Sequence, residues 1–580
     1  MSKLSVDRKR IGDLFRDRES DFLIPDYQRP YEWDDEECQT LWDDIFAFAF
    51  PDDNYLNFDD NNDEYFLGPI VVFKNERNKL EVIDGQQRLT TLMLLLRAFY
   101  SRFENMQDQG SQSTRDDIAK CVWKTNIFGQ PNFEELKINS EVASDDDKDE
   151  FIKILKDGKV PEEFKSQYAE NFRFFEDKIN KFINDFPMYC AYLPARIMNN
   201  CILLPIEAES QDFAFRIFST LNDRGKPLSD SDIFKAQFYN FYAGLGEKDK
   251  FISRWKDLEE KCEKNFSPKQ GTPLDDLFTH YMYYIRAAKG VRDTTTVALR
   301  AFYEKDGYRL MKETQTLDNL EKLADFWGDI KAFDGAAFSD RVLRKLYVLS
   351  YAPNGMWEYL ASVYFMANKD EAGHLDEEEF YKFLDKITAF IFAYAFMHPG
   401  VSSLRGPVFP EMINIVNKQP VKFENFKFNK KAVLDGMKNY AFTNQRMITK
   451  SILTWLAFND ARQKLFNPGD KLEIEHIFPK KRQENERTLK NSKSLDSIGN
   501  KAILEKRVNI RAADYKFQDR KRYYLGFVTD RGVVKEGTKN QELLDMATQR
   551  KDFTEQDITA RENKIFESFI EYLRINELLN

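Results

Sequence analysis

One of the four histidines in the chain, His476, has neighbours that could take part in hydrolysis. Glu475 precedes it, an apolar pair and a proline occupy 477–479, and Asn500 and Asn509 follow at short range. A neutral imidazole, with an unperturbed pKa of about 6.5, can take a proton at neutral pH. Carboxylate and amide oxygens suit Mg²⁺ or Mn²⁺ better than Zn²⁺. These residue types predict metal-assisted hydrolysis, with His476 as the base and with Glu475 and Asn509 as metal ligands.

Short elements must position these side chains. Residues 471–474 have the pattern of a strand that the following proline ends, and the apolar residues of 498–504 surround a Gly-Asn turn that leads into a second strand. A helix is expected from about residue 509 to residue 524. Asn500 could then hold the loop that orients His476. This order of strand, loop, strand and helix, with His, Asn and Asn, is the one in which an HNH (ββα-metal) nuclease presents its site.

The window 471–525 is basic, although the chain as a whole has a formal net charge of −11. It holds 15 Lys or Arg and eight Asp or Glu, an excess of seven positive charges. A basic patch at the proposed site would contact phosphates and make binding depend on salt. A solvated helix face with a chance excess of lysine is the alternative. The DNA contacts that we expect here are Lys480, Lys481 and Lys521.

A second polar motif follows a predicted hairpin near the N-terminus. Residues 66–73 and 80–83 predict two strands joined by a polar turn, and 89–100 predicts an apolar helix. The motif between them therefore lies on a strand-to-helix turn, where free amides attract anions. Its arginine can hold a phosphate through a planar fork, and its aspartate could hold a metal or a ribose hydroxyl. The alternative is a helix cap with a surface arginine. The predicted nucleotide-binding residues are Asp84, Gly85, Gln86, Gln87 and Arg88.

Two further N-terminal motifs, 24–33 and 218–228, carry arginines and aromatic residues. The basic residues in these motifs and just after them could bind the same anionic ligand as the strand-to-helix turn at 84–88. The aromatic residues of 24–33 could stack on bases, or they could pack as core aromatics. The added nucleotide-binding candidates are Arg29, Asn222, Arg224 and Lys235, and the added DNA-binding candidates are Tyr27, Gln28, Arg29 and Tyr31.

Composition narrows the class of protein. The chain has 580 residues, of which 42% are hydrophobic and 32% charged, and its 51 Phe and 26 Tyr argue against disorder. No run of about 18 apolar residues and no apolar signal core is present, so we expect no membrane partner. Five cysteines without paired metal spacing predict reduced thiols in a cytoplasmic protein. The acidic total predicts that DNA binding is confined to patches. The predicted domains are 1–240, a helical middle region 241–405, and 406–580.

The N-terminal motifs and the C-terminal Glu-His-Ile-Phe-Pro, Gly-Asn and Asn pattern together resemble the GmrSD-like type IV restriction enzymes, a family that includes SspE-type phage-defence proteins. The resemblance implies an α+β, predominantly helical fold with a ParB/sulfiredoxin-like N-terminal domain that binds and hydrolyses nucleoside triphosphate. It also implies a C-terminal HNH nuclease domain, with His476 as general base and Asn500 and Asn509 at the remaining HNH positions. Many members have Asp where this chain has Glu475, and the longer carboxylate can still ligate a metal.

The main prediction is a cytoplasmic, nucleotide-responsive DNA endonuclease that restricts phage DNA with modified bases or backbone. Its expected cofactors are Mg²⁺ or Mn²⁺ and a nucleotide (GTP, UTP or ATP). One alternative is a modified-DNA or nucleotide sensor with a weak nuclease fold, and another is an NTPase that acts on a partner. Because an HNH site cuts one strand, double-strand breaks would indicate two sites and hence a possible homodimer.

Overall fold

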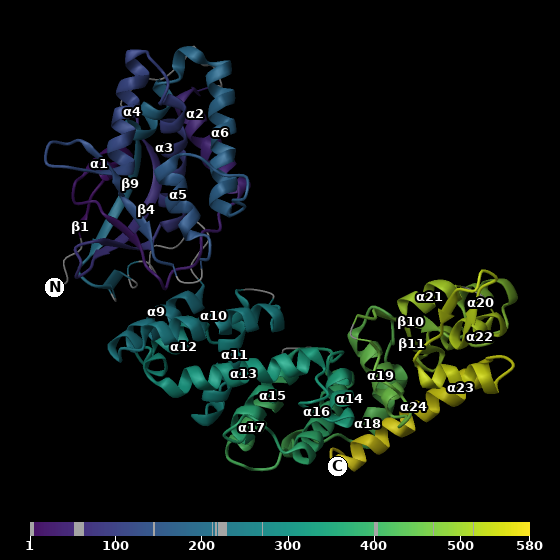
Figure 1. Cartoon of the computed structure of the whole chain (residues 1–580). Helices are drawn as coiled ribbons and strands as arrows, with labels where there is room; N and C mark the ends of the chain where they lie inside the picture. Colours follow the sequence, from purple (N-terminus) through teal and green to yellow (C-terminus); the bar gives the residue numbers. More distant parts are fainter. Residues whose placement is uncertain are drawn as a thin grey trace. The chain divides into compact units, whose positions relative to one another are not determined.

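The computed structural model divides into two compact units, Met1–Lys256 and Asp257–Asn580, and the boundary falls inside helix α10 (Lys248–Asn265) (Figure 1). The described residues are 5–51, 63–142, 145–211, 213–214, 217, 229–268, 271–398, 404–467, 469–513 and 516–580.

Strands form the centre of the first unit. Its described strands are β1 (Ser5–Val6), β2 (Lys9–Arg10), β3 (Phe22–Ile24), β4 (Tyr65–Lys74), β5 (Leu80–Asp84), β6 (Trp123–Thr125), β7 (Pro131–Leu136), β8 (Ile138–Ser140) and β9 (Cys201–Ala208). One mixed sheet has the order β1-β9-β4-β5-β3-β8, with β2 also paired to β9, and β6 and β7 form a separate hairpin. β4 is antiparallel to β5 and parallel to β9, whereas β3 is parallel to β5 and β8.

Helices cover both faces of this sheet. They are α1 (Ile11–Arg16), α2 (Asp35–Ala49), α3 (Gln86–Phe103), α4 (Gln109–Val122), α5 (Lys148–Asp157), α6 (Gln167–Asp185), η3 (Pro187–Tyr189), α7 (Tyr192–Asn200) and α9 (Asp230–Gly244). Side chains alternate along a strand, so Ile70 and Val72 of β4 join the apolar cluster that contains α3. Val71 and Phe73 join a second cluster with Ala236 of α9. Burial on both faces explains why β4 has a continuous apolar run.

The predicted hairpin and helix near the N-terminus are confirmed. β4 and β5 pair antiparallel, β5 ends at Asp84, and α3 begins at Gln86. Gly85 between them has a φ of 89°, in the left-handed region that favours glycine. A Cβ at this position would lie 2.6 Å from Cγ2 of Ile70, so the turn needs glycine for space as well as for conformation.

The second unit is mostly helical. Its described helices outside residues 472–536 are the end of α10, α11 (Pro273–Ala288), α12 (Leu299–Glu304), η4 (Arg309–Lys312), α13 (Thr314–Ala332), α14 (Asp340–Leu349), α15 (Met356–Asn368), α16 (Glu377–Met397), α17 (Arg405–Val416), η6 (Glu424–Phe426), α18 (Lys430–Asn439), α19 (Met447–Phe458), α23 (Gln541–Gln549) and α24 (Glu555–Ile575). Phe380, Ile387 and Phe390 of α16 are fully buried, so the aromatic pattern of this region serves packing.

Two strands and a helix carry the C-terminal motif, and we name them the ββα segment: β10 (Leu472–His476), β11 (Lys501–Glu505) and α21 (Lys506–Ala512). β10 and β11 are antiparallel, and His476 is opposite Lys501. The connection between them contains α20 (Lys480–Glu486), η7 (Ser492–Asp496) and η8 (Ile498–Asn500), and α22 (Phe517–Leu525) and the hairpin β12 (Gly526–Val528) and β13 (Val534–Glu536) follow α21.

Both predicted strands of the ββα segment are confirmed, but the single helix predicted from 509 to 524 is wrong. The helix ends at Ala512, and a second one starts at Phe517. Ala513 has a φ of 44°, which takes the backbone out of the helical conformation. Its carbonyl accepts a hydrogen bond from the Arg520 guanidinium, so a tertiary contact favours the break.

The predominantly helical α+β fold class is confirmed. The structure groups the middle helices and the C-terminal segment in one unit, and the division into three domains stays a prediction. None of the described helices is long and apolar enough to cross a membrane.

Close packing of η8 on α24 generates the first prediction. A Cβ on Gly499 would lie 2.2 Å from the Ile558 carbonyl oxygen and 2.9 Å from the Glu562 Cβ. We expect Gly499→Ala to destabilise the protein by roughly 1–3 kcal/mol, as overpacking does in a close-packed interior. Urea unfolding of the full chain measures it. Gly406→Ala is the control, because a Cβ at Gly406 in α17 would meet nothing within 4 Å. Equal stability of the two variants would contradict the prediction.

Candidate functional site

The two faces of β10 carry different chemical groups. Side chains alternate along a strand, so Glu473 and Glu475 lie on one face and His476 on the other. The contacts agree with this arrangement: Asn509 and Arg520 pair with the two glutamates, whereas the His476 imidazole meets Asp496. The end of β10 therefore has an acidic side and an imidazole side.

His476 is buried and has one carboxylate partner. Its Nε2 lies 3.3 Å from Oδ1 of Asp496, and the Lys501 Nζ lies 3.6 Å from the same oxygen. Burial, with the nearby charges of Lys501 and Lys480, lowers the pKa of His476 to about 4, although Asp496 opposes the shift. The imidazole is thus neutral at neutral pH. Burial favours a higher pKa for Asp496, but its pKa is lowered overall by His476, Lys501 and Lys480.

Asn500 holds the chain that leaves β10. Its Oδ1 accepts a hydrogen bond from the Phe478 amide at 2.7 Å, and its Nδ2 donates to the carbonyls of Phe478 at 3.0 Å and Leu495 at 2.9 Å. The Asn500 side chain is fully buried. Water therefore cannot reach these backbone groups to form the hydrogen bonds in its place. Asn500 fixes the loop directly after His476 and does not face the imidazole's carboxylate partner.

Two buried guanidinium groups hold the ends of the strands. Arg520 of α22 pairs with Glu475 at 2.8 Å and donates to the carbonyl of His476. Arg561 of α24 donates through Nη1 to carbonyls in and next to η8, and pairs with Glu542 at 2.8 Å. Five N–H donors in a fixed fork allow one arginine to satisfy several acceptors. The site geometry therefore depends on α22 and α24 as well as on the ββα segment.

Hard oxygen donors are present on the acidic side. The Asn509 Nδ2 donates to Oε2 of Glu473 at 2.9 Å, and Glu475 lies two residues further along the same face. Two carboxylates and one amide oxygen match the chemistry of Mg²⁺ or Mn²⁺, which keep several waters. Such an ion would share the Glu475 carboxylate with Arg520. Within the described residues no group of three His, Cys, Asp or Glu could hold a metal, so this donor set depends on the asparagine.

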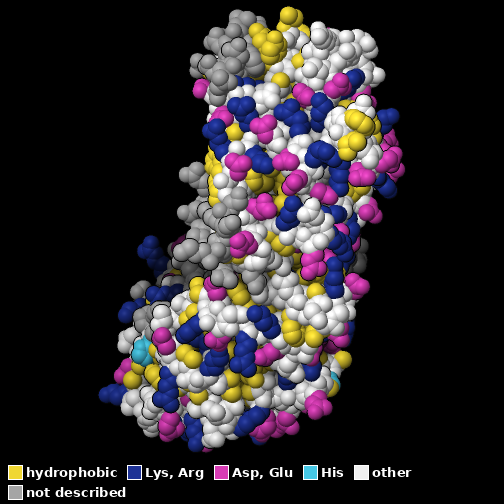
Figure 2. All heavy atoms as spheres, turned by 90° about the vertical axis from the view of Figure 1, so that its left-hand side faces the viewer, with side chains coloured by type: hydrophobic (Ala, Val, Ile, Leu, Met, Phe, Trp, Pro, Cys, Tyr) yellow, Lys and Arg dark blue, Asp and Glu magenta, His cyan; other side chains and the backbone are white. Residues whose placement is uncertain are grey.

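In the folded structure, several lysines and arginines of the basic window 471–525 already have acidic or carbonyl partners. Fewer of them are therefore available to contact phosphates than the sequence suggests. Arg482 pairs with Asp552, Lys516 pairs with Glu486, and the Lys521 ammonium donates to the Arg550 carbonyl. On another part of the surface, the face that Figure 2 draws, basic and acidic side chains are also mixed. Two of the three predicted DNA-contacting lysines, Lys480 and Lys481, are exposed at the start of α20.

Three residues of this site were not found from the sequence. Glu473 could have been found, because it precedes Glu475 at the spacing that puts both on one face of a strand. Asp496 is 20 residues from its partner His476. Arg520 is on a separate helix. No local pattern marks either of these two.

The N-terminal turn brings three predicted residues close together. Arg88 donates to the Pro69 carbonyl at 2.9 Å, and its guanidinium lies over Gly68, where a Cβ would be 3.1 Å away. Burial raises the pKa of Asp84, and the Gly85 amide, Arg88 and Arg29 oppose this. Burial also lowers the pKa of Arg88. Arg29, Asp84 and Arg88 therefore interact electrostatically and could face one anionic ligand.

The two glutamines of the motif bind backbone rather than pointing out of the protein. Oε1 of Gln87 accepts from the amides of Glu32 and Trp33, and its Nε2 donates to the Pro30 carbonyl at 2.9 Å. Nε2 of Gln86 donates to the Arg29 carbonyl at 3.2 Å. Both hold segment 24–33 against the start of α3, and this hydrogen bonding positions Arg29 beside the turn.

Three of the expected DNA contacts lie in the interior. Tyr27, Gln28 and Tyr31 are 3%, 3% and 8% exposed. Gln28 donates to the carbonyls of Val82 and Ile83, and the Tyr31 hydroxyl is 2.6 Å from the Thr91 hydroxyl. Side chains this buried do not reach DNA, so the core-packing alternative describes them. Lys235 is also buried, and Asn222 and Arg224 lie outside the described residues.

Family models match both ends of the chain. The model described as the GmrSD restriction endonuclease N-terminal domain matches residues 11–239, and the model described as the C-terminal domain of GmrSD restriction endonucleases matches residues 427–568. The chain belongs to the GmrSD restriction endonuclease family. It is therefore a type IV restriction endonuclease, as the resemblance predicted. A comparison with curated proteins gave no match.

The two GmrSD domain matches each contain one of the sites described above. The Asp84–Arg88 turn lies in the N-terminal match, and the ββα segment with Asp496 lies in the C-terminal match. Helices α10 to α17 lie between the two matched ranges.

The backbone contacts of Asn500 generate a second prediction. Asn500→Ala would leave the buried amide and carbonyl of Phe478 without their partner, at a cost of about 1–3 kcal/mol per group. We expect faster hydrogen exchange in residues 477–500 and lower stability of the full chain. Asn509→Ala is the matched control, because it removes one part-buried hydrogen bond and should leave exchange in that range unchanged. Similar exchange in both variants would refute the positioning role of Asn500.

Proposed function

We propose that the ββα segment is an HNH-type, metal-dependent nuclease site in which His476 is the general base. The observation that supports this most is the neutral, buried His476 at the end of β10, with Asp496 on its Nε2 and oxygen donors on the opposite face. Endonuclease activity follows from the family. The metal dependence and the roles of individual residues are the proposal.

The partners of His476 indicate which ring nitrogen would act. An ionised carboxylate only accepts hydrogen bonds, so Nε2 carries the hydrogen that Asp496 accepts. Nδ1 then has the free lone pair and takes a proton from the attacking water. As the O–H bond of water breaks, its oxygen forms a bond to phosphorus and the bond to the leaving oxygen breaks. The protonated imidazole that results is stabilised by Asp496.

Glu473, Glu475 and Asn509 would hold the metal ion. When bound, Mg²⁺ or Mn²⁺ supplies a Lewis acid that neutralises charge on the phosphate and on the leaving oxygen. Lys480 and Lys481 would contact the DNA backbone beside the site, and Lys521 would do so after releasing the Arg550 carbonyl.

We further propose that the N-terminal turn binds a nucleoside triphosphate and hydrolyses it. Arg29 and Arg88 beside Asp84 support recognition of an anionic group, and Asp84 could accept from a ribose hydroxyl or bind a metal. Gln86 and Gln87 act by holding Arg29 in place. Asn222, Arg224 and Lys235 remain candidates for the same ligand. Nuclease control by nucleotide would need a differential affinity of a few kcal/mol between two states.

The first test is cleavage of modified phage DNA with Mg²⁺ or Mn²⁺ by wild type and His476→Ala. We expect the variant to lose roughly 100- to 10,000-fold in rate, as removal of a general base does. His374→Ala is the control, because the His374 side chain is 81% exposed and lies in the same unit. Removal of the metal with EDTA should abolish cleavage without unfolding the protein. Wild-type rates in His476→Ala, or cleavage in EDTA, would eliminate this mechanism.

The nucleotide proposal has its own test. A hydrogen bond to a charged group contributes about 1.5–3 kcal/mol, so Arg88→Ala should weaken GTP, UTP or ATP binding roughly 10- to 150-fold. Calorimetric titration of the full chain measures this. Arg88→Lys, which keeps the charge but loses the fork, should bind with intermediate affinity. Arg18→Ala, at an exposed position of the same unit, is the control. Unchanged affinity in a folded Arg88→Ala protein would exclude the turn as the binding site.

Unmodified, glucosyl-hydroxymethylated and phosphorothioated DNA should be compared in the same cleavage assay. NTP hydrolysis without cleavage of any of them would favour the alternative functions, an NTPase that acts on a partner or a nucleotide or modified-DNA sensor with a weak or inactive nuclease segment.

A further inference from the structure

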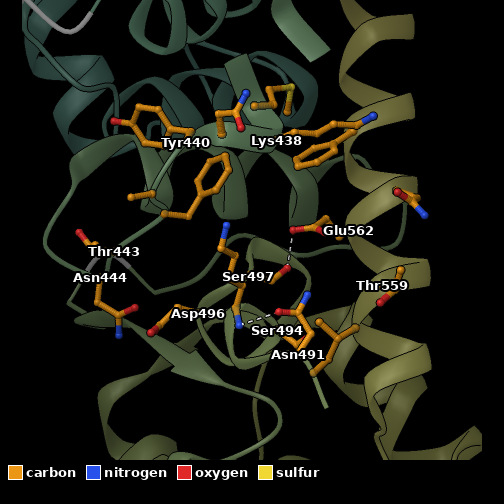
Figure 3. Close-up of a pocket in the computed structure, with 18 of the residues that line it drawn as sticks. Lys438, Tyr440, Thr443, Asn444, Asn491, Ser494, Asp496, Ser497, Thr559 and Glu562 are labelled. Atoms are coloured by element: carbon orange, nitrogen blue, oxygen red, sulfur yellow. Dashed lines mark hydrogen bonds between the residues drawn. The ribbon is translucent and has the colours of Figure 1, made fainter. Parts of the chain in front are cut away.

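A large polar pocket opens beside the imidazole side of β10. Its volume is about 1010 Å³, and its walls are segment 437–445 (the end of α18 and the residues that follow it), Lys480, the η7 region and one side of α24 (Figure 3). Asp496, the hydrogen-bond partner of His476, is one of the lining residues. Ligand pockets of about 300–1,000 Å³ hold molecules of drug size, so this pocket has room for a nucleotide.

The pocket wall and the strands of the site are joined by hydrogen bonds. Asn444 donates to the Ile474 carbonyl of β10 at 3.2 Å, and the buried Lys501 of β11 donates to the Phe442 carbonyl. The pocket therefore has a fixed position relative to His476, and a ligand in it would lie beside Asp496, the hydrogen-bond partner of the imidazole.

The charges of the pocket favour an anion. Lys438, Lys480 and Lys493 line it, and their ammonium groups form no hydrogen bond or ion pair within the part of the chain that the structure describes. The two lining carboxylates have partners already: Asp496 interacts with His476 and Lys501, and Glu562 accepts from the Ser497 hydroxyl at 2.5 Å. Three cations without an ion-pair partner would attract a phosphate group.

The neutral lining suits a nucleoside. Tyr440 lines the pocket, and the Arg446 guanidinium lies over one face of its ring, 4.8 Å from the centroid. A base would stack on the other face, which is a sequence-tolerant interaction. The remaining groups are mostly amides and hydroxyls, which both donate and accept hydrogen bonds. They include Asn439, Thr443, Asn444, Asn491, Thr559 and Asn563.

We propose that this pocket binds a nucleotide of the DNA strand that is cut, next to the scissile phosphate, with its phosphate near Lys438 and Lys493 and its base against Tyr440. The proposal rests on the nuclease function proposed above. It assigns to segment 437–445 and α24 the positioning of the substrate strand, which the ββα segment alone does not provide. A free nucleotide has the same chemistry, so the test includes it.

Binding is measured first, in a His476→Ala background that does not cut. Anisotropy of a labelled oligonucleotide with full-length Lys438→Ala and Lys493→Ala should show about 3- to 10-fold weaker binding. Each lost phosphate contact should also reduce the slope of log K against log salt by about 0.7 for single strands or 0.9 for duplex. Tyr440→Ala should weaken binding roughly tenfold, within the range for loss of one stacking contact. Lys431→Ala, exposed on the same helix as Lys438, should bind like the parent.

Cleavage and competition separate the remaining outcomes. With His476 restored, the same pocket variants should cut more slowly than Lys431→Ala, and the two lysine variants should keep the thermal midpoint of wild type. Binding and cleavage equal to the Lys431→Ala control would overturn the pocket assignment and leave the nuclease proposal standing. Pocket variants that weaken GTP, UTP or ATP binding but not DNA binding would reassign the pocket to a free nucleotide. Wild type that binds DNA through the pocket but cuts no DNA would refute the nuclease mechanism alone.

Discussion

The geometry of the ββα segment depends on one buried side-chain amide, that of Asn500. The chain leaves β10 after His476 and enters β11 at Lys501, and this connection contains only short helices. Asn500 bonds to Phe478, 22 residues earlier in the chain. The amide and carbonyl of Phe478 have no strand partner in the loop, and backbone groups of this kind are costly to bury unpaired. The Asn500 side chain supplies an acceptor and a donor to them at once. Because Asn500 directly precedes β11, these hydrogen bonds connect the residues that follow β10 to the start of β11.

Arginines supply the second constraint on the same region. Carbonyls at the ends of two short strands and of η8 point into a region that water does not reach, and Arg520 and Arg561 satisfy them. Each guanidinium also has a carboxylate partner, Glu475 or Glu542. A buried ion pair contributes little net stability, whereas loss of one partner costs several kcal/mol. These pairs therefore fix the geometry of the site more than they add to the stability of the fold.

Local patterns predicted the local structure well. The β4–β5 hairpin, α3, β10 and β11 each have a clear apolar period or a glycine turn, and all were found. The break at Ala513 was missed because it depends on Arg520, a contact across the turn between helices. The polar residues of segment 24–33 and of the Asp84–Arg88 turn were ambiguous for a different reason. The same types of polar side chain can form hydrogen bonds to buried backbone groups or bind a ligand. The roles of Gln28, Gln86 and Gln87 could therefore not be assigned until their hydrogen-bond partners were known.

Separation of the two chemical groups on opposite faces of one strand has an evolutionary consequence. A substitution at Glu473 or Asn509 alters the oxygen donors without touching the imidazole, and a substitution at Asp496 alters the imidazole's partner without touching the donors. If the site acts as proposed, ion preference and proton transfer can diverge separately among relatives, each through changes that leave β10 itself intact. Glu475 is tied to both faces, because its partner Arg520 also donates to the His476 carbonyl. We therefore expect selection to keep a carboxylate, Glu or Asp, at this position.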